Sequence, residues 1–358
     1  MNVLLIGDYP PPYGGVAIHV QQLQSFLRSA DVEATVLDIG KGGRQAPDVL
    51  PVHTGVRLLA QLTRFLARGY VPHLHTSGNN PKAWLLAAGV GTAARLARAG
   101  AVITLHSGLL PGYLAESPGR RRFARMALSG YDRVIAVSEE VADALAGSGV
   151  PASRIRVYPA FCASQVKPGP APAAFADARA RRGPLLAMAH HPSPVYGRGL
   201  MLAALAKLAE KHPRIGLAVF GPGTQSPEFL ADAETYGVTG RIEDFGELPH
   251  DQALGLIQGC DTFVRPTTAD GDSISVREAM ALGVPCVASD VCQRPRGVRL
   301  FQAGDAAALA ARIDEALGAG PPSYAGPDAG PVLLGIYRRL SMGRRSYAEP
   351  AAAGPWRG

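Results

Sequence analysis

Two carboxylates and a glycine-containing loop stand close together between residues 265 and 290. The pattern predicts a strand ending near Arg265, a polar loop through Gly271, a helix over residues 273–282 and a strand over residues 284–288. Unpaired N–H groups at such a helix start form a cradle for phosphate or for hydroxyl groups. Asp270 lies at the mouth of the loop, and Glu278 follows about two helical turns later. This arrangement suits a ligand that carries both phosphate and sugar hydroxyls.

A purely structural interpretation of the same stretch stands beside this one. Ser273 can be a helix N-cap, Asp270 and Asp272 can be ordinary turn residues, and Glu278 can be a solvated helix position. Capped helices after strands are common, so the stretch alone does not decide between the two interpretations.

The first predicted strand covers residues 3–6, and a second glycine-containing loop follows it. Three consecutive prolines stiffen this loop, which also contains Gly14 and Gly15, and we expect a helix to follow it through Leu27. Glycines at this point let the backbone approach a ligand without a Cβ in the way. The loop is not a GxGxxG motif, and only Asp38 takes the place of the acidic residue about twenty positions later. A simple structural turn is the alternative.

Strands alternate with helices along the rest of the chain, which predicts parallel sheets covered on both faces. The expected strands are 34–39, 73–76, 102–105 and 133–137, then 185–189, 217–220, 242–245 and 262–265. The expected helices are 56–68, 82–99 and 121–128, then 200–211, 229–236, 249–258 and 306–317. Ligands of such sheets bind beyond the carboxyl ends of the strands, which gives His106, directly after a strand, a functional interpretation. We interpret His73 and His75, inside a strand, as packing or sheet-edge residues.

A segment of low order over residues 159–184, rich in Pro, Ala and Arg, predicts the domain boundary. We expect an N-terminal domain over residues 1–165 and a second domain over residues 166–330. A helix over residues 331–343 would return to the N-terminal domain, and residues 344–358 form an expected disordered tail.

The composition describes a folded protein with an uneven charge. The chain has 358 residues, of which 47% are hydrophobic and 18% charged, and a net charge of +7. Residues 1–165 carry 16 basic and 10 acidic residues, so an anionic partner should meet this half. Arginines among alanines and leucines without aromatic residues argue against nucleic acid. Arg57, Arg64 and Arg68, with the cluster at residues 120–122 and 125, suggest contact with an anionic membrane surface, and a solvated face is the alternative.

The cysteines and the N-terminus set the expected compartment. The four cysteines lack paired CxxC spacing, which predicts free thiols, a reducing compartment and no metal site. The first residues predict a strand and not a signal peptide, and no run is long enough to span a membrane. We therefore expect a cytoplasmic protein, with any contact to the inner face of the membrane peripheral.

Taken in order, these motifs resemble the retaining nucleotide-sugar glycosyltransferases of family 4. The resemblance rests on the Gly14-Gly15 loop, His106 and residues 134–140, on the loop from His190 to Gly199 and residues 245–250, and on Asp270 to Glu278 with the Ala-Met-Ala-Leu-Gly-Val-Pro that follows. It covers about residues 1–320. It implies the α/β GT-B fold, in which two Rossmann-like domains face each other across a cleft.

The resemblance also implies roles for individual residues. Asp270 and the backbone of Gly271, Asp272 and Ser273 would bind the donor sugar, and Glu278 the donor ribose. Gly14 and Gly15 would approach the donor phosphate, His106 would lie near the reacting carbon, and Arg198 would bind the diphosphate, beside His190. A nucleoside diphosphate sugar would be a co-substrate, with no cofactor and no metal, and a glycan or lipid-linked hydroxyl would be the acceptor in polysaccharide or cell-envelope synthesis.

Three positions depart from the family pattern. Asp270 stands where the family usually has Glu, which shortens the reach by one methylene group. His190 stands where Arg is usual, and Arg198 replaces the usual Lys after a slightly longer loop. Three other functions remain open: a sugar-nucleotide epimerase or hydrolase on the same fold, a non-catalytic binder of sugar nucleotides or anionic lipid, and a nicotinamide oxidoreductase. The absence of a GxGxxG motif counts against the last of these.

Overall fold

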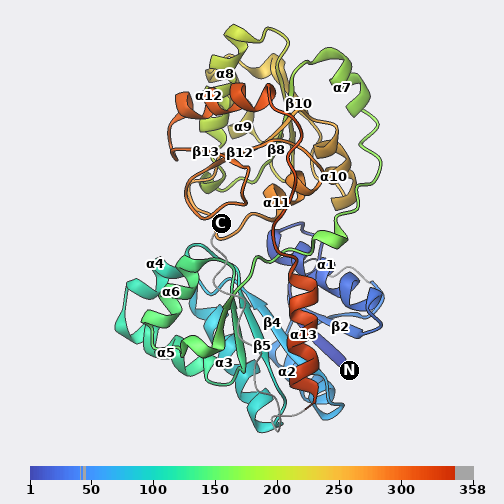
Figure 1. The fold of residues 1–358 in the computed structure, drawn as a ribbon, viewed down its shortest axis with the longest axis vertical. Helices are drawn as coiled ribbons and strands as arrows, with labels where there is room; N and C mark the ends of the chain where they lie inside the picture. Colours follow the sequence, from blue (N-terminus) through green and yellow to red (C-terminus); the bar gives the residue numbers. More distant parts are fainter. Residues whose placement is uncertain (41, 43–45, 343–358) are drawn as a thin grey trace. The chain divides into compact units, whose positions relative to one another are not determined.

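The chain folds into two α/β units, each built around a parallel sheet (Figure 1). The computed structural model describes residues 1–40, 42 and 46–342. Residues Met1–Gln165 and the segment from Pro327 form the first unit, and Val166–Gly326 form the second. The expected tail over residues 344–358 lies outside the described residues.

The first unit contains a seven-stranded sheet in the order β3-β2-β1-β4-β5-β6-β7, in which every described pair is parallel. Its strands are β1 (Asn2–Gly7), β2 (Glu33–Asp38), β3 (Val49–Pro51), β4 (Val71–Thr76), β5 (Val102–Leu105), β6 (Arg133–Ala136) and β7 (Ile155–Val157). Its helices are α1 (Gly15–Ser29), α2 (Gly55–Ala67), α3 (Pro81–Leu96), α4 (Leu110–Ala115), α5 (Pro118–Leu128), α6 (Glu139–Gly147) and α13 (Ala329–Ser341).

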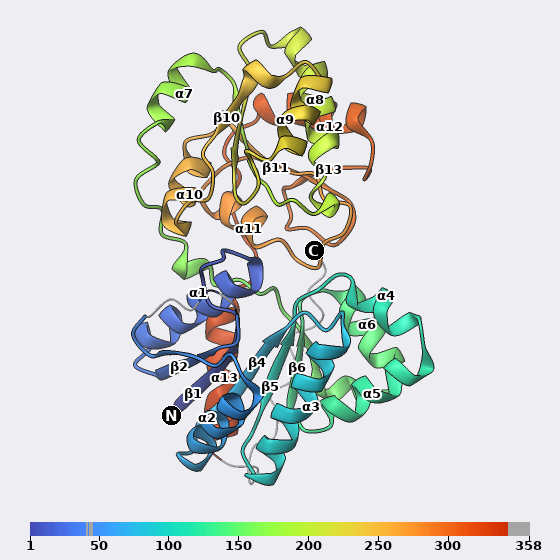
Figure 2. The ribbon, with the colours of Figure 1, turned by 180° about the vertical axis from the view of Figure 1, so that it is seen from behind.

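Helices cover both faces of this sheet because its strands are apolar on both sides. Leu4 and Ile6 of β1 point to the face covered by α2, α3 and α5, and Val3 and Leu5 point to the face covered by α1 and α13. Helix α13 lies before the strands in Figure 1, and α3 lies before them in the reverse view of Figure 2. Helix α13 thus joins residues far apart in sequence into one core.

The second unit repeats this topology, with its six strands in the order β10-β9-β8-β11-β12-β13. Its strands are β8 (Leu185–Ala189), β9 (Gly216–Phe220), β10 (Ile242–Asp244), β11 (Thr262–Arg265), β12 (Cys286–Ser289) and β13 (Arg299–Phe301). Its helices are α7 (Phe175–Arg181), α8 (Arg198–Lys211), α9 (Pro227–Thr235), α10 (His250–Gln258), α11 (Ile274–Ala281) and α12 (Ala306–Leu317).

One expectation from composition was wrong. Residues 159–184 are not of low order throughout, because helix α7 lies within them. Arg179 forms an ion pair with Asp261, and Arg182 forms one with Glu243. These long-range ion pairs tie the helix region to the second sheet, and a composition rich in Pro and Ala gave no sign of them.

The order of each sheet reverses between two central strands, β1 and β4 in the first unit and β8 and β11 in the second. Ligands of open α/β sheets bind beyond the carboxyl ends of the strands at such switch points. His190 directly follows β8, and the loop that contains Asp270 follows β11. Local chain order therefore brings these two predicted site regions to one edge of one sheet.

Candidate functional site

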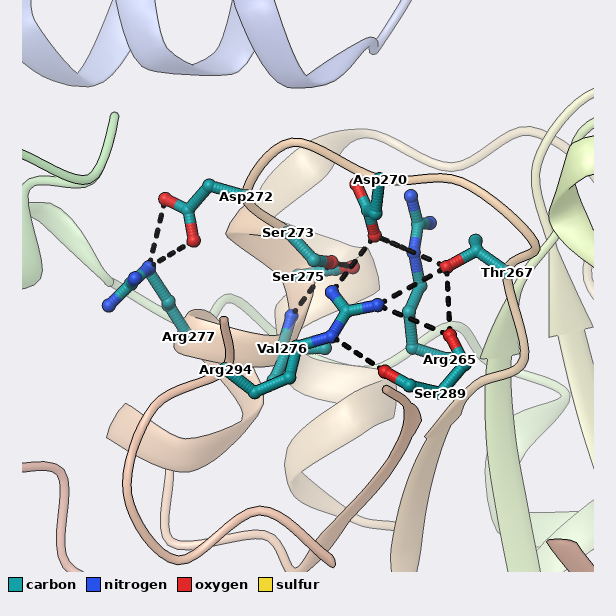
Figure 3. Close-up of polar contacts among 10 residues, drawn as sticks. All are labelled: Arg265, Thr267, Asp270, Asp272, Ser273, Ser275, Val276, Arg277, Ser289 and Arg294. Atoms are coloured by element: carbon teal, nitrogen blue, oxygen red, sulfur yellow. Dashed lines mark hydrogen bonds and ion pairs between the residues drawn. The ribbon is translucent and has the colours of Figure 1, made fainter. Parts of the chain in front are cut away.

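Asp270 is held by two arginines through one carboxylate oxygen. Its Oδ2 accepts hydrogen bonds from Arg265 Nε at 3.1 Å and from Arg294 Nη1 at 3.0 Å (Figure 3). The Thr267 hydroxyl lies 3.4 Å from the same oxygen. Asp270 Oδ1 has no hydrogen-bond partner in the part of the chain that the structure describes. The carboxylate is therefore anchored on one side and available on the other.

Arg294 is buried, and its guanidinium is fixed by several acceptors. Its side chain is only 1% exposed. Nε donates to the Ser289 carbonyl at 3.1 Å, and Nη2 reaches the hydroxyls of Thr267 and Ser289 at 3.3 and 3.4 Å. Burial alone raises the pKa of Asp270, but Arg265 and Arg294 outweigh it and hold that pKa below its usual value. Asp270 is consequently a pre-positioned anion at neutral pH.

The next residues of the loop form the start of helix α11. Both oxygens of Asp272 accept from Arg277 Nε, at 2.7 and 3.0 Å, so that this side chain stays turned to its own helix. Burial raises the pKa of Asp272, and Arg277 offsets that rise only in part. Ser273 caps the helix, because its hydroxyl accepts from Val276 N at 3.5 Å. Ser273 is thus the N-cap of the structural interpretation, whereas Asp272 forms a buried ion pair and is not an ordinary turn residue. The backbone of Gly271, Asp272 and Ser273 stays a predicted sugar contact.

Glu278 pairs with a histidine from the neighbouring helix. Its side chain is 5% exposed, and its Oε1 lies 2.8 Å from His250 Nε2 on α10. Burial lowers the pKa of His250, but Glu278 raises it more, so the net shift is upward. Glu278 is therefore not a solvated helix position. His250 was not among the predicted site residues, because only the packing of α10 on α11 reveals it.

His190 and Arg198 flank the loop after β8. His190 is 3% exposed, and neither ring nitrogen has a hydrogen-bond partner among the described residues. Burial, followed by the charge of Arg198, lowers the pKa of His190 to about 4, so the ring is neutral at pH 7. Arg198 Nε lies 2.6 Å from Asp232 Oδ2, and no described residue accepts from its Nη atoms. Both Nη groups are thus open to an anion.

A close backbone approach seats the loop after β8 against the loop after β11. Gly197 has φ +71, and a Cβ there would stand 1.9 Å from the Pro266 carbonyl oxygen. Thr268 N also donates to the Val195 carbonyl at 2.9 Å. Arg198, one residue further, is therefore positioned by the same loop packing that positions Asp270.

In the first unit, His106 lies at the carboxyl end of β5 within a group of four histidine rings. His106 Nε2 lies 3.2 Å from Nδ1 of His75, the last residue but one of the neighbouring strand β4. The His19 ring on α1 lies 5.3 Å from that of His75 and 5.5 Å from that of His106. His73 and His75 are buried strand residues as predicted, but the contact between His75 and His106 was missed, because strand order cannot be read from local pattern.

Gly14 and Gly15 form the start of α1 at the same edge of the first sheet. Gly14 is the N-cap and Gly15 the first helical residue, and a Cβ on Gly14 would meet no atom within 4 Å. Packing within the unit therefore does not require glycine at position 14. The ligand approach through these amides stays a prediction.

No group of three or more His, Cys, Asp or Glu side chains in the described residues has a geometry that could hold a metal ion. Cys162, Cys260 and Cys286 are buried free thiols, and burial raises the pKa of each. None of the described helices is both long enough and apolar enough to cross a membrane.

Known proteins resemble this chain in sequence and in fold. The family model "Glycosyltransferase Family 4" matches residues 13–161, and "Glycosyl transferases group 1" matches residues 185–319. A curated relative, the glycogen synthase of Mycobacterium tuberculosis (strain ATCC 25618 / H37Rv), is 25% identical over 369 residues, which cover 88% of this chain and 86% of the relative.

Two solved structures show the same fold. Anabaena Alr3699/HepE, in complex with UDP-glucose, matches with a TM-score of 0.69 at 18% identity, over 96% of this chain and 98% of that one. The sucrose-phosphate synthase of Thermosynechococcus elongatus matches with a TM-score of 0.66 at 20% identity, over 96% and 99%. On its two family matches and its paired parallel-sheet units, this chain is a glycosyltransferase of the GT-B fold.

Proposed function

We propose that the protein is a retaining glycosyltransferase that moves a sugar from a nucleoside diphosphate sugar to a hydroxyl group of a glycan or lipid-linked acceptor. The observation that carries this proposal is the one-sided anchoring of Asp270, which leaves Oδ1 as an acceptor for a donor-sugar hydroxyl. A carboxylate already ionised and fixed binds a hydroxyl with little cost in side-chain entropy.

The remaining donor contacts come from groups whose positions are set by packing. The backbone of Gly271, Asp272 and Ser273 binds the sugar, and Glu278, steadied by His250, binds the ribose. The Nη groups of Arg198 bind the diphosphate, with neutral His190 beside Arg198, and the phosphate contact of Gly14 and Gly15 in the first unit stays a prediction from the resemblance. A guanidinium pairs well with phosphate because its donors match two phosphate oxygens at once.

The reaction needs charge stabilisation on the leaving diphosphate more than it needs a protein nucleophile. The acceptor hydroxyl attacks from the face that the diphosphate leaves, the new glycosidic bond forms as the bond to phosphate breaks, and the departing phosphate takes the acceptor proton. Retention follows because attack and departure share one face. Arg198 supplies the positive charge without a metal ion, and a polysaccharide or envelope glycan is the setting that the resemblance favours.

The names of similar proteins support a nucleotide sugar as donor. Anabaena Alr3699/HepE binds UDP-glucose in its solved structure, and the sequence relative is a glycogen synthase. A thermal-shift screen of nucleoside diphosphate sugars tests this, because a ligand that binds the folded state raises the melting temperature.

The comparison variants are Asp270→Ala and, as a matched control, Asp177→Ala on the exposed face of α7. We expect Asp270→Ala to abolish transfer while leaving the shift produced by the free nucleoside diphosphate, and Asp177→Ala to change neither. Transfer by Asp270→Ala at the rate of the unaltered protein would reject the assignment.

Three further measurements separate the alternatives. The anomeric configuration of the first product, read by proton NMR, should equal that of the donor. Activity should persist in EDTA. Donor consumption without acceptor would favour an epimerase or hydrolase, and donor binding without transfer to any acceptor in a panel would favour a non-catalytic binder.

We also propose that the first unit meets an anionic membrane surface through its arginines. Arg122, Arg125 and Arg154 line a cavity of about 450 Å³ together with apolar side chains such as Met126 and Val150, and no acidic residue lines it. No described residue forms an ion pair with these three arginines. Such a surface attracts anionic lipid headgroups and lets apolar side chains reach the acyl boundary.

A further inference from the structure

The two rings of His75 and His106 share a single hydrogen bond at the carboxyl edge of the first sheet. Strands β4 and β5 are paired with His75 opposite Thr104, and His106 N donates to the Thr76 carbonyl at 3.0 Å. This backbone hydrogen bond extends the ladder between β4 and β5 by one residue and fixes the position of the His106 backbone, from which the ring projects. The two rings then meet with His75 Nδ1 and His106 Nε2 at 3.2 Å.

Both rings are neutral, so only one of the two nitrogens in this contact carries a proton. Burial, followed by neighbouring histidines, lowers the pKa of His75 and of His106 well below 6.5. The rings of His19 and His73 pack against His75, at 5.3 and 4.0 Å between centroids, and His19 is itself neutral because burial lowers its pKa to about 4. Two neutral imidazoles have two possible proton arrangements across one hydrogen bond.

The other ring nitrogen of His75, Nε2, decides between the two proton arrangements. His75 Nε2 is buried and has no hydrogen-bond partner among the described residues. Orphaned buried N–H groups are rare in proteins, and acceptors that lack a donor are more common. The less costly arrangement therefore leaves His75 Nε2 without a proton, which places the His75 proton on Nδ1.

We propose that His75 is a positioning residue that sets the tautomer of His106. His75 Nδ1–H donates to His106 Nε2, so the proton of His106 must stand on Nδ1. His106 Nδ1 has no partner among the described residues, and His106 is partly exposed as a residue. His106 consequently presents an N–H donor to its ligand, as an oxygen of the donor sugar requires, and does not act as a general base.

The first test reads the tautomer without any substrate. Long-range proton–nitrogen NMR spectra of protein labelled with ¹⁵N-histidine distinguish a protonated ring nitrogen from an unprotonated one, and His106→Gln assigns the signals. We expect protonated Nδ1 and unprotonated Nε2 on His106 at pH 7.5. A protonated Nε2 on His106 would overturn the proposal.

The second test uses two replacements of His75. The amide of His75→Asn can stand where Nδ1 stood and donate to His106 Nε2, whereas His75→Leu removes the donor at similar volume. We expect His75→Asn to keep the His106 tautomer and kcat/KM for the donor within about threefold, and His75→Leu to lose the single tautomer and lower kcat/KM about tenfold or more. Equal behaviour of the two variants, with both folded by circular dichroism, would reject the role of His75.

The proposal rests on the proposed function only for the identity of the ligand oxygen. The predicted tautomer without any sugar transfer would leave the histidine pair intact and reject the proposed function. Transfer with the opposite tautomer would keep the function and reject the histidine pair.

Discussion

Arg294 lies 24 residues beyond Asp270 in sequence, yet its Nη1 stands 3.0 Å from Asp270 Oδ2. The same guanidinium donates to the Ser289 carbonyl at the end of β12, which joins the site carboxylate to the neighbouring strand. The shortened side chain at position 270 is thus held by an arginine from a different loop, and its position depends on that partner.

Replacing this arginine should therefore affect both ionisation and stability. In Arg294→Met, Asp270 keeps only Arg265, so its pKa rises and the acid limb of kcat/KM moves to higher pH. The ion pair contributes stability above the unfolded pKa of 3.8 that is lost as the pH falls through the lower folded value. We expect a loss of about 3 kcal/mol in the free energy of unfolding at pH 7, measured by urea denaturation.

Arg312→Met is the matched control. Arg312 pairs with Glu315 on an exposed face, with the two side chains 48% and 51% exposed, so its loss should cost less than about 1 kcal/mol. An acid limb at the same pH in both variants would contradict the role of Arg294.

The two units should respond differently to acid. In the first unit burial lowers the pKa of four histidines, His19, His73, His75 and His106, below 6.5. Their contribution to the free energy of unfolding is full above pH 6.5 and is lost as the pH falls, because these histidines bind protons in the unfolded chain at a pH at which they stay neutral in the folded chain. Each adds about 1.4 kcal/mol per pH unit to the slope.

In the second unit the pKa values of two histidines are shifted in opposite directions. The pKa of His190 is lowered to about 4, but that of His250 is raised, so His250 contributes stability below pH 6.5 that is lost as the pH rises through its folded value. Hydrogen exchange followed by mass spectrometry between pH 7.5 and 5 should show the first unit losing protection first. Equal loss in both units would contradict this expectation.

The packing of helix α13 on the first sheet should depend on the phenolic hydroxyl of Tyr337. Tyr337 is buried, and its hydroxyl forms a hydrogen bond with His73 Nδ1, while His73 Nε2 lies 2.8 Å from the Thr104 hydroxyl. Tyr337→Phe leaves His73 Nδ1 buried without a partner and should cost about 1–3 kcal/mol by urea denaturation. Tyr236→Phe, at a side chain 40% exposed, is the control and should be nearly neutral. A neutral Tyr337→Phe would show that the hydroxyl does not hold the helix.

Membrane contact can be tested through the arginine cavity. Arg122→Glu combined with Arg125→Glu should lower flotation with vesicles that contain phosphatidylserine at least tenfold, since each basic residue contributes about 1 kcal/mol near such a surface. Arg312→Glu changes charge elsewhere and should not. Flotation of the unaltered protein that is independent of anionic lipid would reject the membrane proposal.

Local pattern was enough to predict the α/β fold, because the alternation of apolar strands and amphipathic helices is a property of short segments. It also placed His106 and His190 directly after strands and Asp270 in the loop after a strand, since the carboxyl end of a strand is visible in the sequence itself. The resemblance of these motifs to family 4 glycosyltransferases implied the function, and the family matches support a glycosyltransferase.

The tertiary structure alone decided the partners of these residues. Which strands become neighbours determines that His75 meets His106, that Arg294 reaches Asp270, and that α10 brings His250 to Glu278. Helix α13, more than 150 residues beyond the first unit's last strand, completes that unit's core. Each of these contacts joins residues separated by 24 or more positions, and local periodicity carries no information about pairing at that distance.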